Sequence, residues 1–378
     1  MDLVRVLGKL ELGGAQLAVL RVSRELHRRY GVRTTLLVGD ATHDGVRLAQ
    51  RHGVQPVAFR SGSDLHPLRN LQWQRSERFA AWLTDKLDDA DLVHAHMIGA
   101  WWAVAQVIDA WTPFVATEHN QVNWATPRVK SLKPAACRID RFYAMGPAAQ
   151  RFAITAGARP EVIRPARSPV AGLRATPRDG LRSPRLTFAG RFCRDKGPDV
   201  LVEAICLLDC RQLTAYLLGD GPLRAPLADQ IQRRGMSARV FMPGWVHAPW
   251  RYVAGSAVHV VPSREEAWSQ SAVLALGLGV PVVGARVDGL VDTLAHSRGL
   301  TVAPDDPIAL SAAIADALTA GSPLDRAGAI SYARQFTSAR TAHFYHSEYQ
   351  ALLTRHHELS QRRSQTTDEH RPPAGPGP

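Results

Sequence analysis

The chain has 378 residues, of which 45% are hydrophobic and 21% are charged, with 29 Gly and 25 Pro. This length suits two domains of ordinary size better than one, and the composition excludes a chain that is disordered throughout. The formal net charge of +12 favours anionic partners such as nucleotide phosphates, a lipid surface or nucleic acid, without choosing among them.

The first half alternates strand-length apolar runs with helical patterns. The helical patterns cover 15–29 and 77–87, and the runs cover 3–7, 34–38, 56–59, 91–96, 114–119 and 141–145. Alternation of this kind builds a parallel sheet that is wrapped by helices. We expect a first Rossmann-like domain over residues 1–165.

Residues 166–184 are rich in Pro, Arg, Gly and Ser and lack an apolar period, which is typical of a linker. The alternation then restarts with runs at 185–190, 214–219, 239–244, 257–263, 281–285 and 299–304. This predicts a second parallel-sheet domain over 185–325. Residues 326–360 read as helices, and the polar, Pro/Gly-rich segment 361–378 is expected to be a disordered tail.

The sequence gives weaker evidence about cellular location and nucleic-acid binding. The N-terminus shows no charged region followed by an apolar core and a cleavage site, and the longest apolar run, 272–285, is interrupted by Gly277, Gly279 and Pro281. The basic stretches lack interleaved aromatic residues, so a nucleic-acid partner is not expected. Four cysteines without zinc spacing or a disulfide framework suit a reducing cytoplasm. Peripheral contact with the anionic inner face of the cell membrane stays open.

Ligands of open parallel sheets bind beyond the carboxyl ends of the strands, so residues after each strand are candidates for a site. Gly13 and Gly14 follow the first run and open the helical pattern at 15. Glycines there let a phosphate approach the free amides and the positive dipole of a helix end. A plain tight turn explains the same pair equally well.

The second domain repeats this arrangement with cations. Gly190 ends the run at 185–190, and Arg191 and Lys196 follow before a helix that begins at Pro198. Preorganised cations and amides are the groups that neutralise a departing diphosphate, although ordinary surface cations remain the alternative. Further strand ends supply Gly219, Gly221 and Trp245.

These segments carry a resemblance to a known family. FAGRFCRDKGPDVLVEA, LLGDGPLR, MPGWV and VVPSREEAWSQSAVLALGLGVPVVGARVDGLVDTL, in this order and spacing, resemble the retaining glycosyltransferases of family 4, whose fold is called GT-B. VLGKLELGGAQ, DLVHAH, FVATEHN and IDRFYAMG are similar to the first domain of that family. The match covers nearly everything except the linker and the tail.

The resemblance implies an α/β GT-B fold, in which two Rossmann-like parallel-sheet domains face each other across a cleft and the last helix crosses back to the first domain. In such a fold the first domain, 1–165, would bind the acceptor and the second, 185–325, would bind the nucleotide sugar. It implies a hexosyltransferase-type enzyme that needs no metal and no cofactor beyond its co-substrate, a nucleotide-diphosphate sugar, with UDP-sugars as the first choice. The acceptor would be a glycan, a lipid-linked glycan or a small molecule. It further implies that Arg191 and Lys196 hold the diphosphate, that His119 contacts the transferred sugar and that Glu266 grips sugar hydroxyls. The implied donor-binding residues are Gly13, Gly14, Gly190, Gly219, Gly221, Trp245, Ser269 and Gln270.

One position departs from the family pattern. Eight residues after Glu266 the family has a second glutamate that binds the ribose, whereas this chain has Leu274. Counting from Glu265 leads to Val273, so the alternative register does not restore a carboxylate. Loss of a charge-assisted hydrogen bond costs about 1.5–3 kcal/mol unless another group replaces it. The nucleotide base is therefore left open.

Metal sites have two weak candidates. His94 and His96 are interpreted as strand residues on opposite faces, which argues against a shared metal site. Asp89-Ala90-Asp91 is similar to the metal motif of the other large glycosyltransferase fold, but it precedes its strand and so lies at the wrong edge of the sheet.

Two other functions remain open beside transfer. A sugar-nucleotide epimerase or hydrolase shares the architecture, and Leu274 is compatible with a non-catalytic sugar-nucleotide or glycan-binding subunit. The donor sugar and the acceptor depend on loops at 65–74 and 121–133, whose sequence does not identify either.

Overall fold

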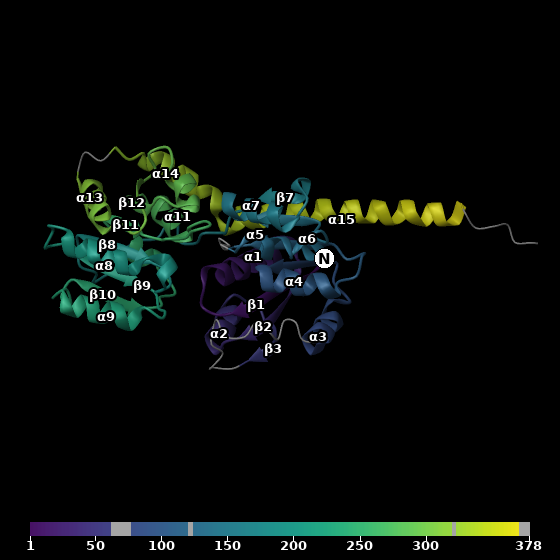
Figure 1. The fold of residues 1–378 in the computed structure, drawn as a ribbon. Coiled ribbons are helices and arrows are strands. Elements are labelled where there is room, and N and C mark those ends of the chain that lie inside the picture. Colours follow the sequence, from purple (N-terminus) through teal and green to yellow (C-terminus); the bar gives the residue numbers. More distant parts are fainter. Residues whose placement is uncertain (62–76, 120–123, 320–322, 370–378) are drawn as a thin grey trace, which may run out of the picture.

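The computed structural model describes residues 1–61, 77–119, 124–319 and 323–369. They form two parallel sheets in two lobes that lie side by side (Figure 1). The first sheet has seven strands in the order β3-β2-β1-β4-β5-β6-β7, and the second has six in the order β10-β9-β8-β11-β12-β13. The prediction of two Rossmann-like parallel-sheet lobes is confirmed.

The strands of the first sheet are β1 (Asp2–Leu10), β2 (Arg33–Ala41), β3 (Pro56–Ser61), β4 (Leu92–His96), β5 (Phe114–Glu118), β6 (Arg141–Ala144) and β7 (Ile163–Pro165). The strands of the second sheet are β8 (Arg185–Ala189), β9 (Thr214–Leu218), β10 (Val240–Gly244), β11 (Val258–Val261), β12 (Val282–Ala285) and β13 (Leu300–Val302).

The helices of the first lobe are α1 (Gly14–Tyr30), α2 (His43–Arg51), α3 (Glu77–Leu87), α4 (Ile98–Val107), α5 (Thr126–Lys130), α6 (Lys133–Ala136), α7 (Pro147–Ala156) and the 3-10 turn η2 (Pro160–Val162). The second lobe has η3 (Arg194–Lys196), α8 (Pro198–Leu207), α9 (Arg224–Arg233), α10 (Trp250–Val253), α11 (Gln270–Gly277), α12 (Asp288–Leu294) and α13 (Pro307–Leu318). The C-terminal segment consists of α14 (Arg326–Ala333), η4 (Arg334–Phe336) and α15 (Ser338–Glu369).

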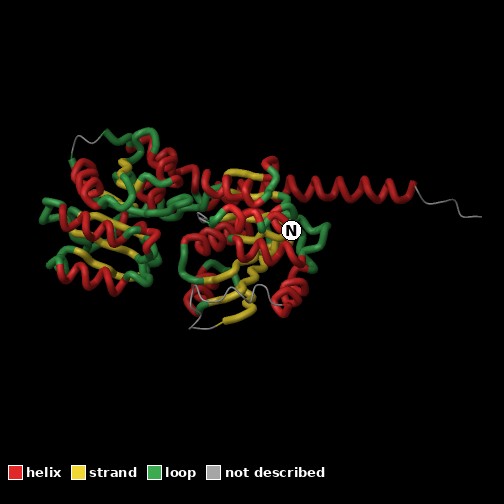
Figure 2. Tube along the Cα trace, in the orientation of Figure 1, coloured by secondary structure: helices red, strands yellow, loops and turns green. Residues whose placement is uncertain are grey.

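Helices cover both faces of each sheet (Figure 2). This explains why the strands are continuous apolar runs instead of alternating ones. In β1, Val6 packs into the core on the side of α3 and α4, whereas Leu7 packs into the core on the side of α1 and α2. β1 pairs in parallel with β2 and β4, so the carboxyl ends of these central strands share one edge of the sheet.

Every strand that the apolar runs predicted is present, with bounds shifted by a few residues. β7 was missed, because a three-residue strand that ends in Pro165 gives too short an apolar signal. Asp91 lies just before β4, where its carboxylate accepts a hydrogen bond from the amide of Asp2 at 2.7 Å. That places it at the amino-terminal edge of the sheet, as predicted.

The last helix returns to the first lobe. α15 packs along α1 (Figure 1). Tyr345, Tyr349 and Leu352 of α15 join Leu3 and Leu26 in one buried cluster. Beside it, the linker residue Val170 pairs with Thr337 in a parallel bridge, so the two segments that connect the lobes run together.

The prediction of a disordered tail over 361–378 is wrong for residues 361–369. α15 continues through Glu369, because residues 361–369 contain neither Gly nor Pro and extend a helix that is already docked. The remainder of the predicted tail, 370–378, lies outside the described residues. In the part of the chain that the structure covers, no helix has the length and apolar character needed to cross a bilayer.

Candidate active site

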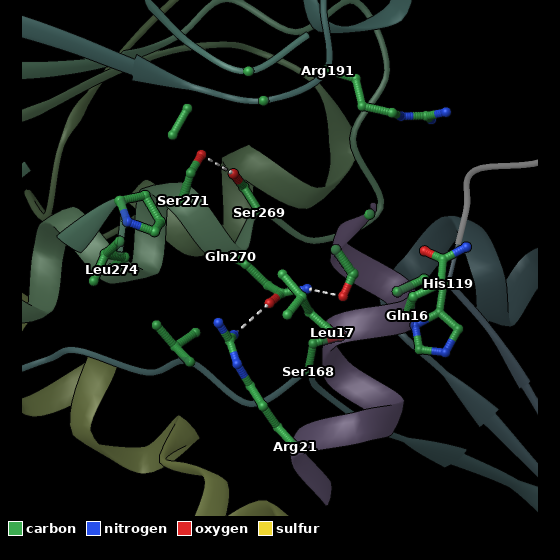
Figure 3. Close-up of a pocket in the computed structure, with 18 of the residues that line it drawn as sticks. Gln16, Leu17, Arg21, His119, Ser168, Arg191, Ser269, Gln270, Ser271 and Leu274 are labelled. Carbon is green, nitrogen blue, oxygen red and sulfur yellow. Dashed lines mark hydrogen bonds between the residues drawn. The ribbon is translucent and has the colours of Figure 1, made fainter. Parts of the chain in front are cut away.

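A cavity of about 730 Å³ lies between the lobes and is lined by residues of both. His119 reaches it from the end of β5, and Arg191 reaches it from the second lobe (Figure 3). Lys196 and Glu266 also line it from the second lobe. Every residue predicted for the site lines this cavity except Gly221. The cavity therefore gathers residues that lie far apart along the chain, such as Gly14 and Gln270, which are 256 positions apart and form a hydrogen bond.

Lys196 forms an ion pair inside this cavity. Its Nζ lies 2.8 Å from Oε2 of Glu266, and the two side chains are 25% and 11% exposed. Ser263 donates a second hydrogen bond to the same carboxylate oxygen at 3.4 Å. The cation predicted for a diphosphate is thus paired with the carboxylate predicted for sugar hydroxyls, so an incoming anion must share or displace that pair.

The backbone that carries Lys196 is held tightly. Gly197 has a φ of +61°, and a Cβ there would lie 2.1 Å from the carbonyl oxygen of Pro262, at the end of β11. Only glycine fits this left-handed turn at such a close approach. The turn at Gly197 lets the 3-10 segment η3 pack directly against the loop that leads to Glu266.

Arg264 fixes the same loop, and the sequence analysis did not single it out. Its guanidinium donates two hydrogen bonds to Asp199, at 2.9 and 2.7 Å, and one to the carbonyl oxygen of Arg194 at 2.7 Å. These bonds to the Asp199 carboxylate raise the pKa of Arg264, despite the opposing effect of burial. The only sequence signal was its place directly after a strand end, two residues before Glu266.

Two of the glycines predicted for the site allow neighbouring loops to pack closely against each other. A Cβ on Gly219 would lie 1.9 Å from the carbonyl oxygen of Gly190, and a Cβ on Gly221 would lie 2.6 Å from that of Phe192. Both have positive φ, +146° and +152°. Gly219 still lines the cavity, whereas Gly221 does not, so the prediction of Gly221 as a donor-binding residue finds no support in its position.

The amino-terminal ends of α1 and α11 approach each other across the cavity. Ser269 caps α11 by accepting a hydrogen bond from the amide of Ala272. The side chain of Gln270 donates to the carbonyl oxygen of Gly14 at 2.9 Å and accepts from Arg21 at 3.4 Å (Figure 3). Two helix ends with free amides and positive dipoles thus face the same space, which favours an anionic ligand.

His119 lines the cavity from the first lobe, and its imidazole is within hydrogen-bond distance of His96. Its Nε2 lies 3.1 Å from Nδ1 of His96. Burial, with a smaller contribution from the charge of Arg5, lowers the pKa of His119 to about 4. The imidazole is therefore neutral at physiological pH.

The expectation that His94 and His96 lie on opposite faces of their strand was wrong. Residues two apart on a strand lie on the same face, and the two rings stack with centroids 4.0 Å apart. His94 bonds Tyr349 and Thr117, whereas His96 bonds Arg5 and His119. Among the described residues no group of three or more His, Cys, Asp or Glu side chains is arranged to hold a metal ion.

Basic side chains outnumber acidic ones on the described walls of the cavity. The acids are Glu11 and Glu266, and each is paired, with Lys9 and Lys196 respectively, at 2.8 Å. Arg21 is desolvated, and this burial, together with the neighbouring Arg24, lowers its pKa to about 10. The basic side chains on these walls are Lys9, Arg21, Arg24, Arg51, Arg191 and Lys196.

Two features bear on the identity of the ligands. Leu274 lines the cavity and is 5% exposed, so no carboxylate occurs at the position that departs from the family pattern.

The loops at 65–74 and 121–133 were expected to select donor and acceptor. Residues 65–74 and 121–123 lie outside the described residues, and Trp124 is stacked under Arg128, whose guanidinium carbon lies 3.7 Å from the ring centroid.

Two family models match the chain, one for each lobe. The model described as Glycosyltransferase Family 4 matches residues 12–169, and the model described as Glycosyl transferases group 1 matches residues 183–320. The boundary between the matches falls in the linker. Together the two models cover most of the chain.

Curated relatives carry related activities. A D-inositol 3-phosphate glycosyltransferase of Jonesia denitrificans is 33% identical over 173 residues, which are 42% of this chain and 40% of the relative. The 2-deoxystreptamine N-acetyl-D-glucosaminyltransferase of Streptomyces fradiae is 26% identical over 364 residues, 82% of this chain and 83% of that protein. The chain spans less than half of the first of these relatives.

Solved structures share the fold along nearly the whole chain. Anabaena HepE, in a complex with UDP and glucose, has a TM-score of 0.76 at 19% identity and covers 93% of this chain and 99% of its own. The pneumococcal O-GlcNAc transferase GtfA, in a complex with UDP and GlcNAc, has a TM-score of 0.73 at 12% identity, with 93% and 99% covered.

Proposed function

Because the chain belongs to the group 1 glycosyltransferases of family 4, we propose that it transfers a sugar from a nucleoside-diphosphate sugar to an acceptor hydroxyl and retains the anomeric configuration. The observation that carries this proposal is the interlobe cavity, where two opposed helix ends and an excess of basic side chains meet a neutral histidine. Such a site suits a ligand with a concentrated negative charge at one end and uncharged hydroxyls at the other.

In the proposed reaction Arg191, Lys196 and the amides at the start of α11 stabilise the diphosphate as it leaves. Lys196 would transfer its hydrogen bond from Glu266 to a phosphate oxygen, which frees the Glu266 carboxylate to accept from sugar hydroxyls. Closure of the lobes would exclude water from the cavity. The acceptor hydroxyl approaches from the first lobe, and a departing phosphate oxygen takes its proton.

UDP-sugars are the first donors to test, because the structural neighbours above were solved with UDP and a sugar. D-inositol 3-phosphate and 2-deoxystreptamine are the first acceptors to test, because they are named for the curated relatives. The basic surface leaves contact with an anionic membrane as a further proposal, which binding to vesicles that contain phosphatidylserine would test.

The decisive experiment measures nucleoside-diphosphate release from UDP-glucose, UDP-N-acetylglucosamine and GDP-mannose, with and without each acceptor. Transfer predicts release that depends on the acceptor, together with a product whose anomeric configuration, read by NMR, matches the donor. Acceptor-independent formation of free or altered sugar would instead support an epimerase or hydrolase. Donor binding by calorimetry without turnover, across the donor and acceptor set, would support a non-catalytic binding subunit.

A further inference from the structure

A buried polar cluster lies beneath His119. It consists of Arg5 on β1, His94 and His96 on β4, Thr117 on β5 and Tyr349 on α15, and we call it the Arg5 cluster. All five side chains are buried, and Arg5 is only 1% exposed. The guanidinium lies 3.2 Å from Nε2 of His96 and 3.2 Å from the hydroxyl of Tyr349.

The chemistry of arginine determines the direction of the first hydrogen bond. A guanidinium has only donors and stays protonated in proteins, so Arg5 must donate and Nε2 of His96 must accept. A neutral imidazole carries its one hydrogen on the other nitrogen. The hydrogen of His96 is therefore on Nδ1, because burial and the neighbouring charges lower the pKa of His96 well below its ordinary value.

The second hydrogen bond follows from the first. Nδ1 of His96 lies 3.1 Å from Nε2 of His119, so His96 donates and His119 accepts at Nε2. His119 is neutral as well, which leaves its hydrogen on Nδ1. One buried cation thereby sets the tautomer of a cavity residue two hydrogen bonds away.

We propose that Arg5 and His96 are positioning residues that hold His119 in the neutral tautomer with hydrogen on Nδ1, so that it serves the reaction as a fixed hydrogen-bond donor. This inference rests on the function proposed above for its catalytic meaning, although the tautomer itself does not. His119 would donate from Nδ1 to an oxygen of the bound sugar. It would not act as the base for the acceptor hydroxyl, because its Nε2 is already engaged.

Tyr349 makes the C-terminal helix part of this arrangement. Its hydroxyl accepts a hydrogen bond from Arg5 at 3.2 Å and lies 2.6 Å from Nδ1 of His94, whose Nε2 lies 2.6 Å from Oγ1 of Thr117. The hydrogen bond from Arg5 to Tyr349 helps to hold the guanidinium within hydrogen-bond distance of His96. Docking of α15 on the first lobe thus contributes to the orientation of His119.

The direct test is long-range ¹H–¹⁵N correlation NMR of protein labelled with ¹⁵N-histidine, without substrate. The His119 signals are identified by their loss in His119→Gln. We expect an unprotonated Nε2 and a protonated Nδ1 in the natural protein, and a mixture of tautomers in Arg5→Met and His96→Leu. A proton on Nε2 of His119 in the natural protein, or unchanged tautomers in both variants, would overturn the proposal.

The kinetic test separates positioning from folding. His96→Leu should lower kcat at least about tenfold, whereas His96→Gln should retain most of the turnover, because its carbonyl can accept from Arg5 while its amide donates to His119. His259→Leu is the matched control, since His259 is a fully buried imidazole of the second lobe that bonds Thr187 and does not line the cavity. Equal losses in His96→Leu and His96→Gln would refute a positioning role. If the natural protein transfers no sugar, the proposed function fails, and the NMR experiment alone decides the tautomer.

Discussion

Replacing Lys196 with Ala tests the candidate site most directly. The Lys196–Glu266 pair is 2.8 Å long and partly solvated, so its loss should change the free energy of unfolding by only about 0–1 kcal/mol. That corresponds to a change in Tm of at most about 4 °C. A charge-assisted hydrogen bond to a departing diphosphate is worth about 1.5–3 kcal/mol. At about 1.4 kcal/mol per factor of ten, kcat/KM should fall roughly 10- to 150-fold.

The assay for this variant is release of UDP from a UDP-sugar, combined with a thermal melt of the same preparation. Lys86→Ala is the matched control, because Lys86 forms an ion pair of the same length with Asp85 on the exposed surface of α3 and does not line the cavity. The control should keep both turnover and Tm. If Lys196→Ala turns over within about twofold of the natural protein, Lys196 does not hold the diphosphate. A loss of turnover that accompanies a large drop in Tm would equally remove the assignment.

Further variants probe the loops, the buried histidines and the last helix. Gly219→Ala should destabilise the fold by about 1–3 kcal/mol or more in urea melts, because its φ is positive and the new Cβ would lie 1.9 Å from a carbonyl oxygen. In Gly14→Ala the new Cβ meets only a flexible glutamine amide at 3.1 Å. That variant should keep its stability and lose donor affinity in calorimetry. Burial lowers the pKa of His259 to about 3, so the unfolded chain binds this proton near pH 6.5 while the folded protein does not, and stability should fall as the pH drops from 6.5 towards 3. His259→Leu should flatten that fall by up to about 1.4 kcal/mol per pH unit in urea melts at pH 7, 6 and 5, and an unchanged slope would contradict a buried neutral imidazole. Tyr349→Phe leaves two buried polar partners unsatisfied and should cost about 1–3 kcal/mol in the same melts, so an unchanged denaturation midpoint would refute the network.

The fold was predictable because its signals are local. Buried parallel strands need apolar side chains on both faces, so each one leaves a run that can be read without knowledge of its neighbours. β7 escaped because three residues that end in Pro165 form no such run. The extension of α15 to Glu369 escaped for a different reason, since a polar segment folds as a helix only because its first half is docked on α1.

The candidate site was predictable to the extent that it follows strand ends. Gly190, Arg191, Lys196 and His119 all come shortly after a strand, and parallel strands deliver such residues to one edge. The partner of Lys196 could not be predicted, because two loops 70 residues apart must first be brought together by Gly197 and Arg264. Gly221 shows the converse error, since a glycine at a strand end can serve backbone packing alone.

Arg5 marks the point at which sequence reasoning fails for a physical reason. In LVRVL it reads as a polar interruption of a strand, and nothing local indicates that it is buried. Its environment depends on Tyr349, 344 residues away, which follows both lobes in the sequence and contacts Arg5 because α15 crosses back to the first lobe. A buried cation without such partners would be strongly destabilising, so Arg5 ties folding of the first lobe to arrival of the last helix.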